Sequence, residues 1–217
     1  MHCCRTQDYS DLFDSQKALA DLNDYRKNGV KKSSRPLFVV IDQLPLQGQT
    51  LLDIGGGIGA VVFELFAKGI RYAEINDISA AYIKQFREES VRQEVVAKSR
   101  SFIGDFTSVH RDIAEADLIT LDKVICCYPD YRSLVQLSSA KARRWYAINL
   151  PRNAWWVYIL MRIDYYWQKM VRGKAFLTYF HPLSEIETQL AQAGFRKIKQ
   201  KTQNEWVALL FERDQNV

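Results

Sequence analysis

The sequence predicts an α/β fold with a mostly parallel sheet of seven strands, and three observations support this prediction. Between about residues 50 and 150, apolar runs of strand length alternate with helix-like stretches. The first apolar run ends in a glycine-rich turn that contains Gly55, Gly57 and Gly59. Near the C-terminus, two short runs separated by a brief turn are typical of an antiparallel hairpin on one edge of a sheet.

The length and composition fit one globular domain. The chain has 217 residues, of which 47% are hydrophobic and 25% are charged. Its net charge of +5 comes with basic clusters at 26–35, 141–144 and 196–201. Such clusters are typical of solvated helix faces and loops. They also fit an electrostatic field that attracts an anionic substrate, a membrane surface or nucleic acid.

The cysteines and the N-terminal composition indicate a reduced, cytoplasmic location. The four cysteines form two adjacent pairs, Cys3-Cys4 and Cys126-Cys127, and not a spaced disulfide framework. The first residues carry charges where a signal peptide needs an apolar core. No apolar run reaches the ~18 residues of a membrane-spanning helix, so no transmembrane segment is expected.

The first 46 residues are expected to form a helical lid segment ahead of a single domain over 47–217. Apolar residues recur at helical spacing after a candidate cap at Asp14 or Ser15, namely Phe13, Leu19, Leu22 and Tyr25. Asn28-Gly29 predicts the end of this helix. Ser33 or Ser34 is expected to cap a second helix that runs from about 36 to about 44.

The rest of the chain predicts alternating strands and helices, followed by a C-terminal hairpin. Strands are expected at 50–54, 70–76, 100–104, 117–121 and 145–150. Helices are expected at 58–68, 79–98, 123–127 and 131–142, which implies right-handed crossovers. An aromatic, amphipathic helix is predicted over 155–167 and another helix over 184–194. The hairpin strands are expected at 195–202 and 205–212, with Gln203 and Asn204 between them.

The spacing around the glycines argues against a dinucleotide and favours another nucleoside ligand. The third glycine of the dinucleotide pattern is missing, because Val62 stands at its position. Asp77 ends the second strand, where a carboxylate offers two acceptor oxygens to a ribose diol. The alternative for Asp77 is a helix N-terminal acid that competes with Ser79. Glu74 is a weaker candidate for the ribose.

The stretch from Leu51 to Gly59 resembles the first motif of class I S-adenosylmethionine (SAM) methyltransferases, a hydrophobic-Asp-x-Gly-x-Gly-x-Gly pattern. The resemblance continues in the same order through four later segments: Asp77, 104–106, 117–122 and 193–195. It is closest to small bacterial methyltransferases distantly similar to the magnesium-protoporphyrin O-methyltransferases, on the basis of 121–130, 146–152 with Trp155-Trp156, and His181-Pro182. This resemblance implies a Rossmann-like class I methyltransferase fold and SAM as the cofactor.

The resemblance also implies roles for individual residues in binding SAM. Gly55, Gly57 and Gly59 let the backbone approach the methionine part. The other expected contacts are Asp53 near the methionine amino group, Asp77 on the ribose, Asp105 on the adenine amino group, Phe106 packed on the adenine ring, and Asp122 at the rim beside SAM and substrate. For Asp105 and Phe106, a loop acid and a core side chain are the alternatives.

Three residues are candidates for catalysis. Tyr128 is expected against the transferred methyl group or the acceptor. His181 is a candidate general base, and a hydrogen-bonded turn histidine is the alternative. Asp130 is a candidate catalytic acid or base, and a helix cap is the alternative that its position before a helix favours. Arg152 could pair with a substrate carboxylate or form a surface salt bridge.

No metal is expected. The two cysteine pairs invite a soft-metal site, but adjacent cysteines rarely face one ion and no histidine has tetrahedral spacing to them. The aromatic residues of 155–167 exceed what one helix face can bury. Some of them are therefore expected to line an apolar substrate pocket or to make a peripheral contact with a membrane.

The predicted function is SAM-dependent transfer of a methyl group by SN2 displacement to a small, largely apolar acceptor, at oxygen. A nucleic-acid methyltransferase is one alternative. Against it, the chain lacks both an Asn/Asp-Pro-Pro-aromatic tetrapeptide and a Pro-Cys nucleophile. A non-catalytic protein that binds SAM or a partner is the other alternative. The sequence indicates neither the acceptor's identity nor the oligomeric state.

Overall fold

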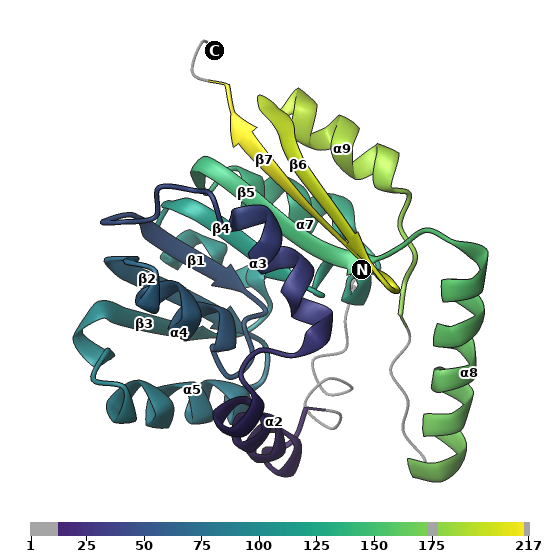
Figure 1. The fold of residues 1–217 in the computed structure, drawn as a ribbon, viewed down its shortest axis with the longest axis horizontal. Helices are drawn as coiled ribbons and strands as arrows, with labels where there is room; N and C mark the ends of the chain where they lie inside the picture. The colour runs from purple at the N-terminus through teal and green to yellow at the C-terminus, as the bar shows by residue number, and fades with distance from the viewer. Residues whose placement is uncertain (1–12, 173–177, 215–217) are drawn as a thin grey trace.

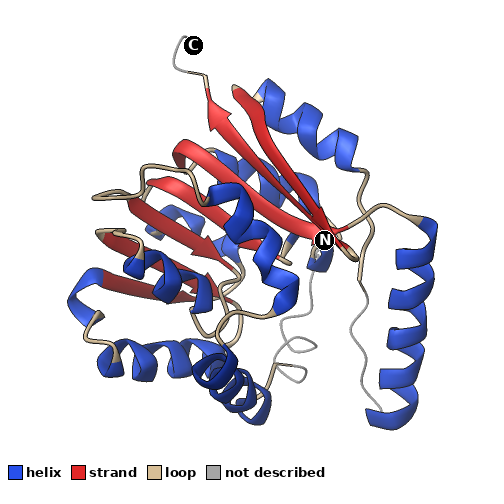
Figure 2. Ribbon diagram, viewed as in Figure 1, coloured by secondary structure: helices blue, strands red, loops and turns tan. Residues whose placement is uncertain are grey.

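The computed structural model describes residues 13–172 and 178–214, which form a seven-stranded sheet between layers of helices (Figures 1 and 2). The strand order is β3-β2-β1-β4-β5-β7-β6. In chain order, the strands are β1 (Thr50–Ile54), β2 (Tyr72–Asp77), β3 (Ser99–Ile103), β4 (Ala116–Asp122), β5 (Ala142–Pro151), β6 (Phe195–Gln203) and β7 (Trp206–Arg213).

The helices connect these strands and cover both faces of the sheet. They are α2 (Ser15–Asn28), α3 (Arg35–Ile41), α4 (Ala60–Ala67), α5 (Ala80–Arg92), α6 (Phe106–Val109), α7 (Tyr131–Ser139), α8 (Trp155–Arg172) and α9 (Leu183–Gln192). Four short 3-10 turns complete the described structure: η1 (Lys32–Ser34), η2 (Val96–Lys98), η3 (His110–Asp112) and η4 (Ile125–Cys127).

The strand pairing places a crevice between β1 and β4. β1 pairs in parallel with β2 on one side and with β4 on the other. The chain first moves outward from β1 through β2 to β3, and then returns to β4 and moves the other way. In open α/β sheets, ligands bind at this reversal, outside the carboxyl ends of the strands. The topology therefore predicts a ligand site among the residues that follow β1, β2 and β4.

Alternating side chains of the central strands build a core on each face of the sheet. Leu52 of β1 packs on the face covered by α7 and α9, and Leu51 packs on the face covered by α3, α4 and α5. Both leucines are fully buried or nearly so. Parallel strands covered on both faces are expected to be apolar on both sides, which is why these strands are near-continuous hydrophobic runs.

The C-terminal hairpin is inserted into the sheet in a particular order. β7 pairs antiparallel with β5, and β6 pairs antiparallel with β7 and forms the edge. The turn between the hairpin strands is Asn204-Glu205, one residue later than predicted, and Asn204 adopts a positive φ of 51°. Asparagine tolerates this left-handed conformation better than most residues, which fixes the turn there.

The predicted class of fold is confirmed, and most differences concern where elements begin and end. The helix expected over 58–68 starts at Ala60, because Gly57 and Gly59 hold positive φ angles before it. The helix expected over 79–98 ends at Arg92, because Glu94 enters the left-handed region and η2 follows. The short helix expected over 123–127 is the 3-10 turn η4.

The predicted N-terminal segment contains two parts with different surroundings. α3 belongs to the core, because Leu37, Val40 and Ile41 are buried in the cluster that also contains side chains of β5 and β7. The part that precedes α3 lies over the carboxyl ends of the strands. We refer to residues 13–34 as the N-terminal cover. The division into a lid at 1–46 and a domain at 47–217 stays a prediction.

Candidate active site

A cavity of about 280 Å³ lies at the carboxyl ends of β1, β2 and β4. Its floor is the glycine turn after β1 together with the ends of β2 and β4, and its roof is the N-terminal cover. The sequence-predicted residues that line it are Asp53, Gly55, Gly57, Asp77, Asp105, Asp122 and Tyr128. The fold thus brings together residues that are separated by up to about a third of the chain.

The glycine turn permits an approach that side chains would block. Gly59 has a φ of 85°, and a Cβ atom there would lie 2.3 Å from Cδ2 of Phe86. Gly56, which the sequence analysis did not single out, has no room for a side chain either, because a Cβ atom would lie 2.5 Å from Oδ2 of Asp53. Gly55, Gly56 and Gly57 present bare backbone to the cavity, whereas Gly59 is not part of its lining and packs on Phe86.

Asp53 carries a buried oxygen without a partner. Its side chain is fully buried, and the hydroxyl of Thr120 donates to Oδ1 at 2.7 Å. Oδ2 accepts no hydrogen bond, although Asp53 lines the cavity. Burial raises the pKa of Asp53 to about 8, and the nearby Asp122 and Asp77 carboxylates add to the shift. An unpaired buried acceptor is costly, so this oxygen is suited to a donor supplied by a ligand.

Asp77 ties the end of β2 to the glycine turn. Its Oδ2 accepts a hydrogen bond from the Gly57 amide at 2.9 Å, and its Oδ1 accepts one from the Ser79 amide at 2.8 Å. Burial raises the pKa of Asp77 even though these two amides favour its charged form. Each carboxylate oxygen keeps a further lone pair, so Asp77 can still accept hydrogen bonds from a vicinal diol. Ser79 caps α5 itself.

Asp105 and Tyr128 form a pair on one wall of the cavity. The Tyr128 hydroxyl donates to Oδ1 of Asp105 at 3.0 Å, and the Thr107 amide donates to the same oxygen at 2.9 Å. Asp105 also caps α6. Phe106 is fully buried in the core and does not line the cavity, so the structure gives it the alternative role of a core side chain.

The N-terminal cover is attached to α5 by charged groups. Arg26 of α2 donates to the fully buried carboxylate of Glu89, with Nη2 at 2.7 Å from Oε2. The Tyr82 hydroxyl donates to Asp21 at 2.6 Å. Arg92 binds Glu89 as well, and these hydrogen bonds lower the pKa of Glu89 to about 2 against the effect of burial. The cover is therefore held by ionised groups and not only by apolar contact.

A second attachment joins the end of the cover to the ends of β4 and β5. The Ser34 hydroxyl donates to Oδ2 of Asp122 at 2.6 Å, and Lys123 Nζ donates to the Ser34 hydroxyl at 2.9 Å. The Asn149 side-chain amide donates to Oδ1 of Asp122 at 2.6 Å and to the Ser33 carbonyl at 2.8 Å. Asp122 thus lies at the rim, as expected, and also anchors the cover.

Replacing Ser34 with alanine is expected to loosen this attachment. The variant removes the hydroxyl shared by Asp122 and Lys123, which should reduce the free energy of unfolding by about 1–2 kcal/mol. Amide hydrogen exchange should become faster in the N-terminal cover than elsewhere. Ser33→Ala is the matched control, because the Ser33 hydroxyl contacts only Lys123, at 3.1 Å. Equal protection of the cover in both variants would contradict this role for Ser34.

Two catalytic candidates lie away from the cavity. His181 donates from Nε2 to the Tyr128 carbonyl at 2.8 Å and lies against Tyr131, with ring centroids 4.2 Å apart and the rings tilted by 31°. Burial lowers the pKa of His181. Asp130 caps α7 by accepting hydrogen bonds from Ser133. Neither lines the cavity, so the structure supports the alternatives of a turn histidine and a helix cap. Their assignment to catalysis stays a prediction that this geometry does not support.

The other residues considered from the sequence make contacts within the protein and away from the cavity or at its edge. Glu74 accepts a hydrogen bond from the Ala114 amide at 2.8 Å and does not reach the cavity. Arg152 donates to the Asn204 carbonyl at 3.2 Å and lies over the ring of Trp156. Cys126 and Cys127 both contact the Lys123 carbonyl, whereas Cys3 and Cys4 lie outside the described residues. Over 13–172 and 178–214, no three or more His, Cys, Asp or Glu side chains are placed to hold a metal.

Several residues at the site were not found from the sequence. Thr120 and Asn149 interrupt apolar strand runs with polar side chains, and both are fully buried. A buried polar residue inside a central strand needs a partner, and this was the signal that could have revealed them. Lys123 adopts a φ of 65°, which is rare for a residue with a side chain. No sequence pattern predicts this conformation.

No protein-family model and no curated protein matches the chain. Solved structures match it over most of its length. Magnesium protoporphyrin IX methyltransferase from Synechocystis PCC 6803, with bound SAH, is 17% identical with a TM-score of 0.66; the match covers 92% of this chain and 87% of that one. An O-methyltransferase family protein from Burkholderia thailandensis is 15% identical with a TM-score of 0.71. That match covers 94% of this chain and 61% of the Burkholderia chain.

A third structure extends the comparison to a bound small molecule. The O-methyltransferase family 2 protein from Planctomyces limnophilus, in complex with apigenin, is 16% identical with a TM-score of 0.65; the match covers 92% of this chain and 62% of that one. The chain thus spans less than two thirds of the Burkholderia and Planctomyces chains. This chain has the class I methyltransferase fold, as the resemblance predicted.

Proposed function

We propose that the chain is a SAM-dependent methyltransferase. The observation that carries this proposal is the convergence of the unpaired Asp53 oxygen, the bare glycine turn and Asp77 on one cavity at the reversal of strand order. In this fold, that position receives a nucleoside. The three features offer an acceptor for an amino group, room for an extended chain, and acceptors for a diol.

The proposed contacts to SAM follow from the chemistry of these groups. Asp53 pairs with the methionine ammonium through Oδ2, and the glycine turn lies against the methionine chain. Asp77 accepts from the ribose hydroxyls, and Asp105 accepts from the adenine amino group. Asp105 is itself positioned by Tyr128 and Thr107. When bound, SAM supplies a methyl group on a sulfonium that is already activated for SN2 transfer.

We further propose that the acceptor is a small, largely apolar molecule that is methylated at oxygen. The cavity is small and roofed by the N-terminal cover, which contributes Phe13, Tyr25 and Val30 to its lining. Ile58 and Val124 add further apolar surface to the lining. A concave site that combines apolar lining with placed polar groups is typical of a small-molecule site. The apigenin bound to the Planctomyces protein lends support by analogy.

An ionised oxygen acceptor needs no general base, which fits a cavity that neither His181 nor Asp130 lines. Transfer to a carboxylate or phenolate forms the O–CH3 bond as the S–CH3 bond breaks, and no proton has to leave the acceptor. The residues around the cavity then need only align the acceptor and exclude water. Tyr128 lines the cavity and is oriented by its hydrogen bond to Asp105, so we assign it to positioning the acceptor.

The test is transfer of the labelled methyl group of SAM to a panel of apolar acids, phenols and tetrapyrroles. Formation of a labelled organic product together with S-adenosylhomocysteine supports the proposal. Labelling of RNA or DNA with salt-sensitive binding would instead support the nucleic-acid alternative. SAM binding without any labelled product across small molecules and nucleic acids would favour the non-catalytic alternative.

We also infer a cytoplasmic location with a peripheral contact to a membrane. The four cysteines form two adjacent pairs and not a spaced disulfide framework, which supports a reducing compartment. Over the part of the chain that the structure describes, no helix is long and apolar enough to cross a membrane. The peripheral contact depends on α8.

A further inference from the structure

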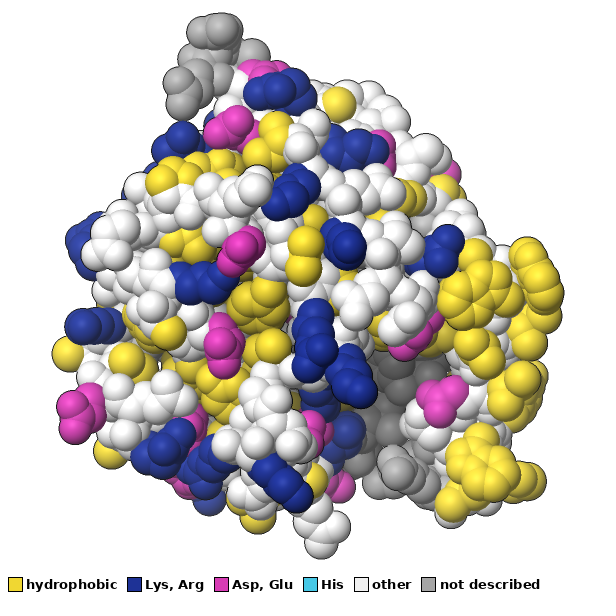
Figure 3. Space-filling model, viewed as in Figure 1, with side chains coloured by type: hydrophobic (Ala, Val, Ile, Leu, Met, Phe, Trp, Pro, Cys, Tyr) yellow, Lys and Arg dark blue, Asp and Glu magenta, His cyan; other side chains and the backbone are white. Residues whose placement is uncertain are grey.

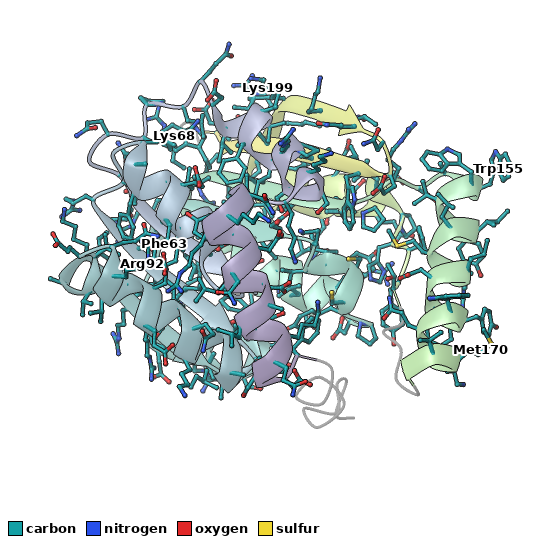
Figure 4. The ribbon with its side chains drawn as sticks, turned by 60° about the horizontal axis from the view of Figure 1, so that its bottom comes forward. Phe63, Lys68, Arg92, Trp155, Met170 and Lys199 are labelled. Carbon is teal, nitrogen blue, oxygen red and sulfur yellow. The ribbon has the colours of Figure 1, made fainter. Side chains whose placement is uncertain are left out.

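α8 presents an apolar surface that no part of the described chain covers. Of the fifteen exposed large hydrophobic side chains among the described residues, nine lie on this one helix. The most exposed are Trp155 at 77% and Met170 at 75%. Figure 3 shows hydrophobic side chains gathered along α8 on one side of the molecule, and Figure 4 shows Trp155 and Met170 at its two ends.

Eight of the nine exposed side chains lie in one continuous arc, which also contains the partly buried Trp156, whereas Tyr158 lies outside it. At the ~100° per residue of an α-helix, the residues between Trp155 and Val171 divide into two faces. The apolar arc contains only hydrophobic side chains: Trp155, Trp156, Ile159, Leu160, Ile163, Tyr166, Trp167, Met170 and Val171. The opposite face carries the charged residues Arg162, Asp164 and Lys169, together with the fully buried Val157.

The placement of α8 makes this arc accessible to a flat surface. The helix stands apart from the sheet in both views of the ribbon, and its long axis runs along the edge of the molecule (Figures 1 and 4). From Trp155 to Met170 the arc extends for roughly 22 Å along the helix axis. A projecting, convex surface of this length suits a planar partner better than it suits a pocket.

The charges and the aromatic residues favour lipid as the partner. Arg162 and Lys169 lie beside one edge of the arc. Within 155–171 the only acidic residue is Asp164, and the whole chain has a net charge of +5. Trp and Tyr side chains favour the boundary between headgroups and hydrocarbon, because their rings are apolar and their N–H or O–H groups are polar. A wide apolar arc with basic residues beside it is the pattern of a helix that lies in a bilayer interface.

We infer that α8 binds the surface of a membrane that contains anionic lipids, with its apolar arc at the level of the headgroups. A second copy of the chain is the competing occupant. Two chains of net charge +5 repel each other, whereas an anionic surface attracts both the helix and the body. The apolar arc is also broader than the narrow seam that two pairing helices share. This inference does not depend on methyl transfer.

Sedimentation of the full chain with phosphatidylcholine vesicles, with and without phosphatidylglycerol, tests the inference. We expect binding to the anionic vesicles and a blue shift of tryptophan fluorescence. The double variant Ile163→Glu with Trp167→Glu should bind at least about tenfold more weakly, because it places two charges in the arc. Arg162→Gln with Lys169→Gln should lose roughly tenfold on anionic vesicles and little on neutral ones.

The matched control is Val91→Glu with Val96→Glu. These valines are also exposed, at 66% and 54%, but they lie outside α8, so vesicle binding should not change. Circular dichroism checks that each variant is folded. Failure of the wild-type chain to sediment with anionic vesicles would overturn the inference, as would binding that Ile163→Glu with Trp167→Glu leaves intact. A dimer that this variant dissociates, without vesicle binding, would assign the arc to a second copy.

Discussion

Replacing Asp77 with alanine is expected to weaken SAM binding by about 1–3 kcal/mol and also to destabilise the fold. The loss of affinity reflects the charged hydrogen bonds that Asp77 is proposed to make with the ribose. The loss of stability has a separate cause. The amides of Gly57 and Ser79 both donate to this partly buried carboxylate, and a buried donor left without an acceptor costs up to about 1–3 kcal/mol.

A control at the other end of the sheet separates these two effects. Asp117 accepts hydrogen bonds from the amide and hydroxyl of Thr50, at the start of β1 and far from the cavity. Asp117→Ala should therefore reduce the free energy of unfolding and leave the Kd for SAM unchanged. Calorimetric titration and urea unfolding of both variants measure the difference. A folded Asp77→Ala protein with the affinity of the wild type would refute the ribose assignment.

Replacing Asp53 with asparagine is expected to weaken SAM binding by about 1.5–3 kcal/mol, because the variant loses the charge that pairs with the methionine ammonium. Asparagine has nearly the same shape, and its oxygen can still accept the hydrogen bond that the Thr120 hydroxyl donates at 2.7 Å. The packing of Gly56 on this side chain is also preserved. The change therefore removes charge more than it alters structure.

The same variant should change how stability depends on pH. Burial raises the pKa of Asp53 from 3.8 to about 8. Between these values the folded protein retains a proton that the unfolded chain releases, so the wild type loses stability as pH rises through this window. Asp53→Asn carries no such proton, so its stability relative to the wild type should increase from about pH 4 to about pH 8 and stay level above that range. Urea unfolding across this range measures the free energy of unfolding of both proteins. If the two free energies change with pH in parallel, Asp53 is ionised in the free protein.

The location of the cavity could be predicted because it depends on local pattern. Asp53, the glycines and Asp77 lie at fixed distances from the ends of two strands, and parallel strands bring their carboxyl ends to one edge. The helix boundaries that differed are those where a residue enters the left-handed region, such as Glu94. Such a residue leaves little trace in hydrophobic periodicity.

The roof of the cavity could not be predicted, because it depends on contacts between distant segments. Ser34 has the local pattern of a helix cap, yet its side chain donates to Asp122, 88 positions later in the chain. Tyr25, which the helical spacing placed on an apolar face, lines the cavity and donates to Glu64. Only the packing of α2 and η1 over the strand ends gives these side chains their partners.

The candidates for catalysis were predicted from residue type, and the structure shows which of them lie at the cavity. Tyr128 faces the cavity, whereas His181 supports the Tyr128 backbone and Asp130 caps a helix. The aromatic residues of α8 illustrate the same limit. Their number predicted that one helix could not bury them all, but the sequence did not distinguish a substrate pocket from an outer surface. None of them lines the cavity.

Calorimetric titration of the wild-type chain with SAM, and separately with NAD, tests the central claim most directly. We predict saturable, micromolar binding of SAM with no heat from NAD. At neutral pH the binding of SAM should also release a proton, because the ammonium group converts Asp53 from its protonated to its ionised form. Repeating the titration in buffers of different ionisation enthalpy detects that proton. Binding of NAD with no response to SAM, or no binding of either, would contradict the assignment of the cavity to SAM.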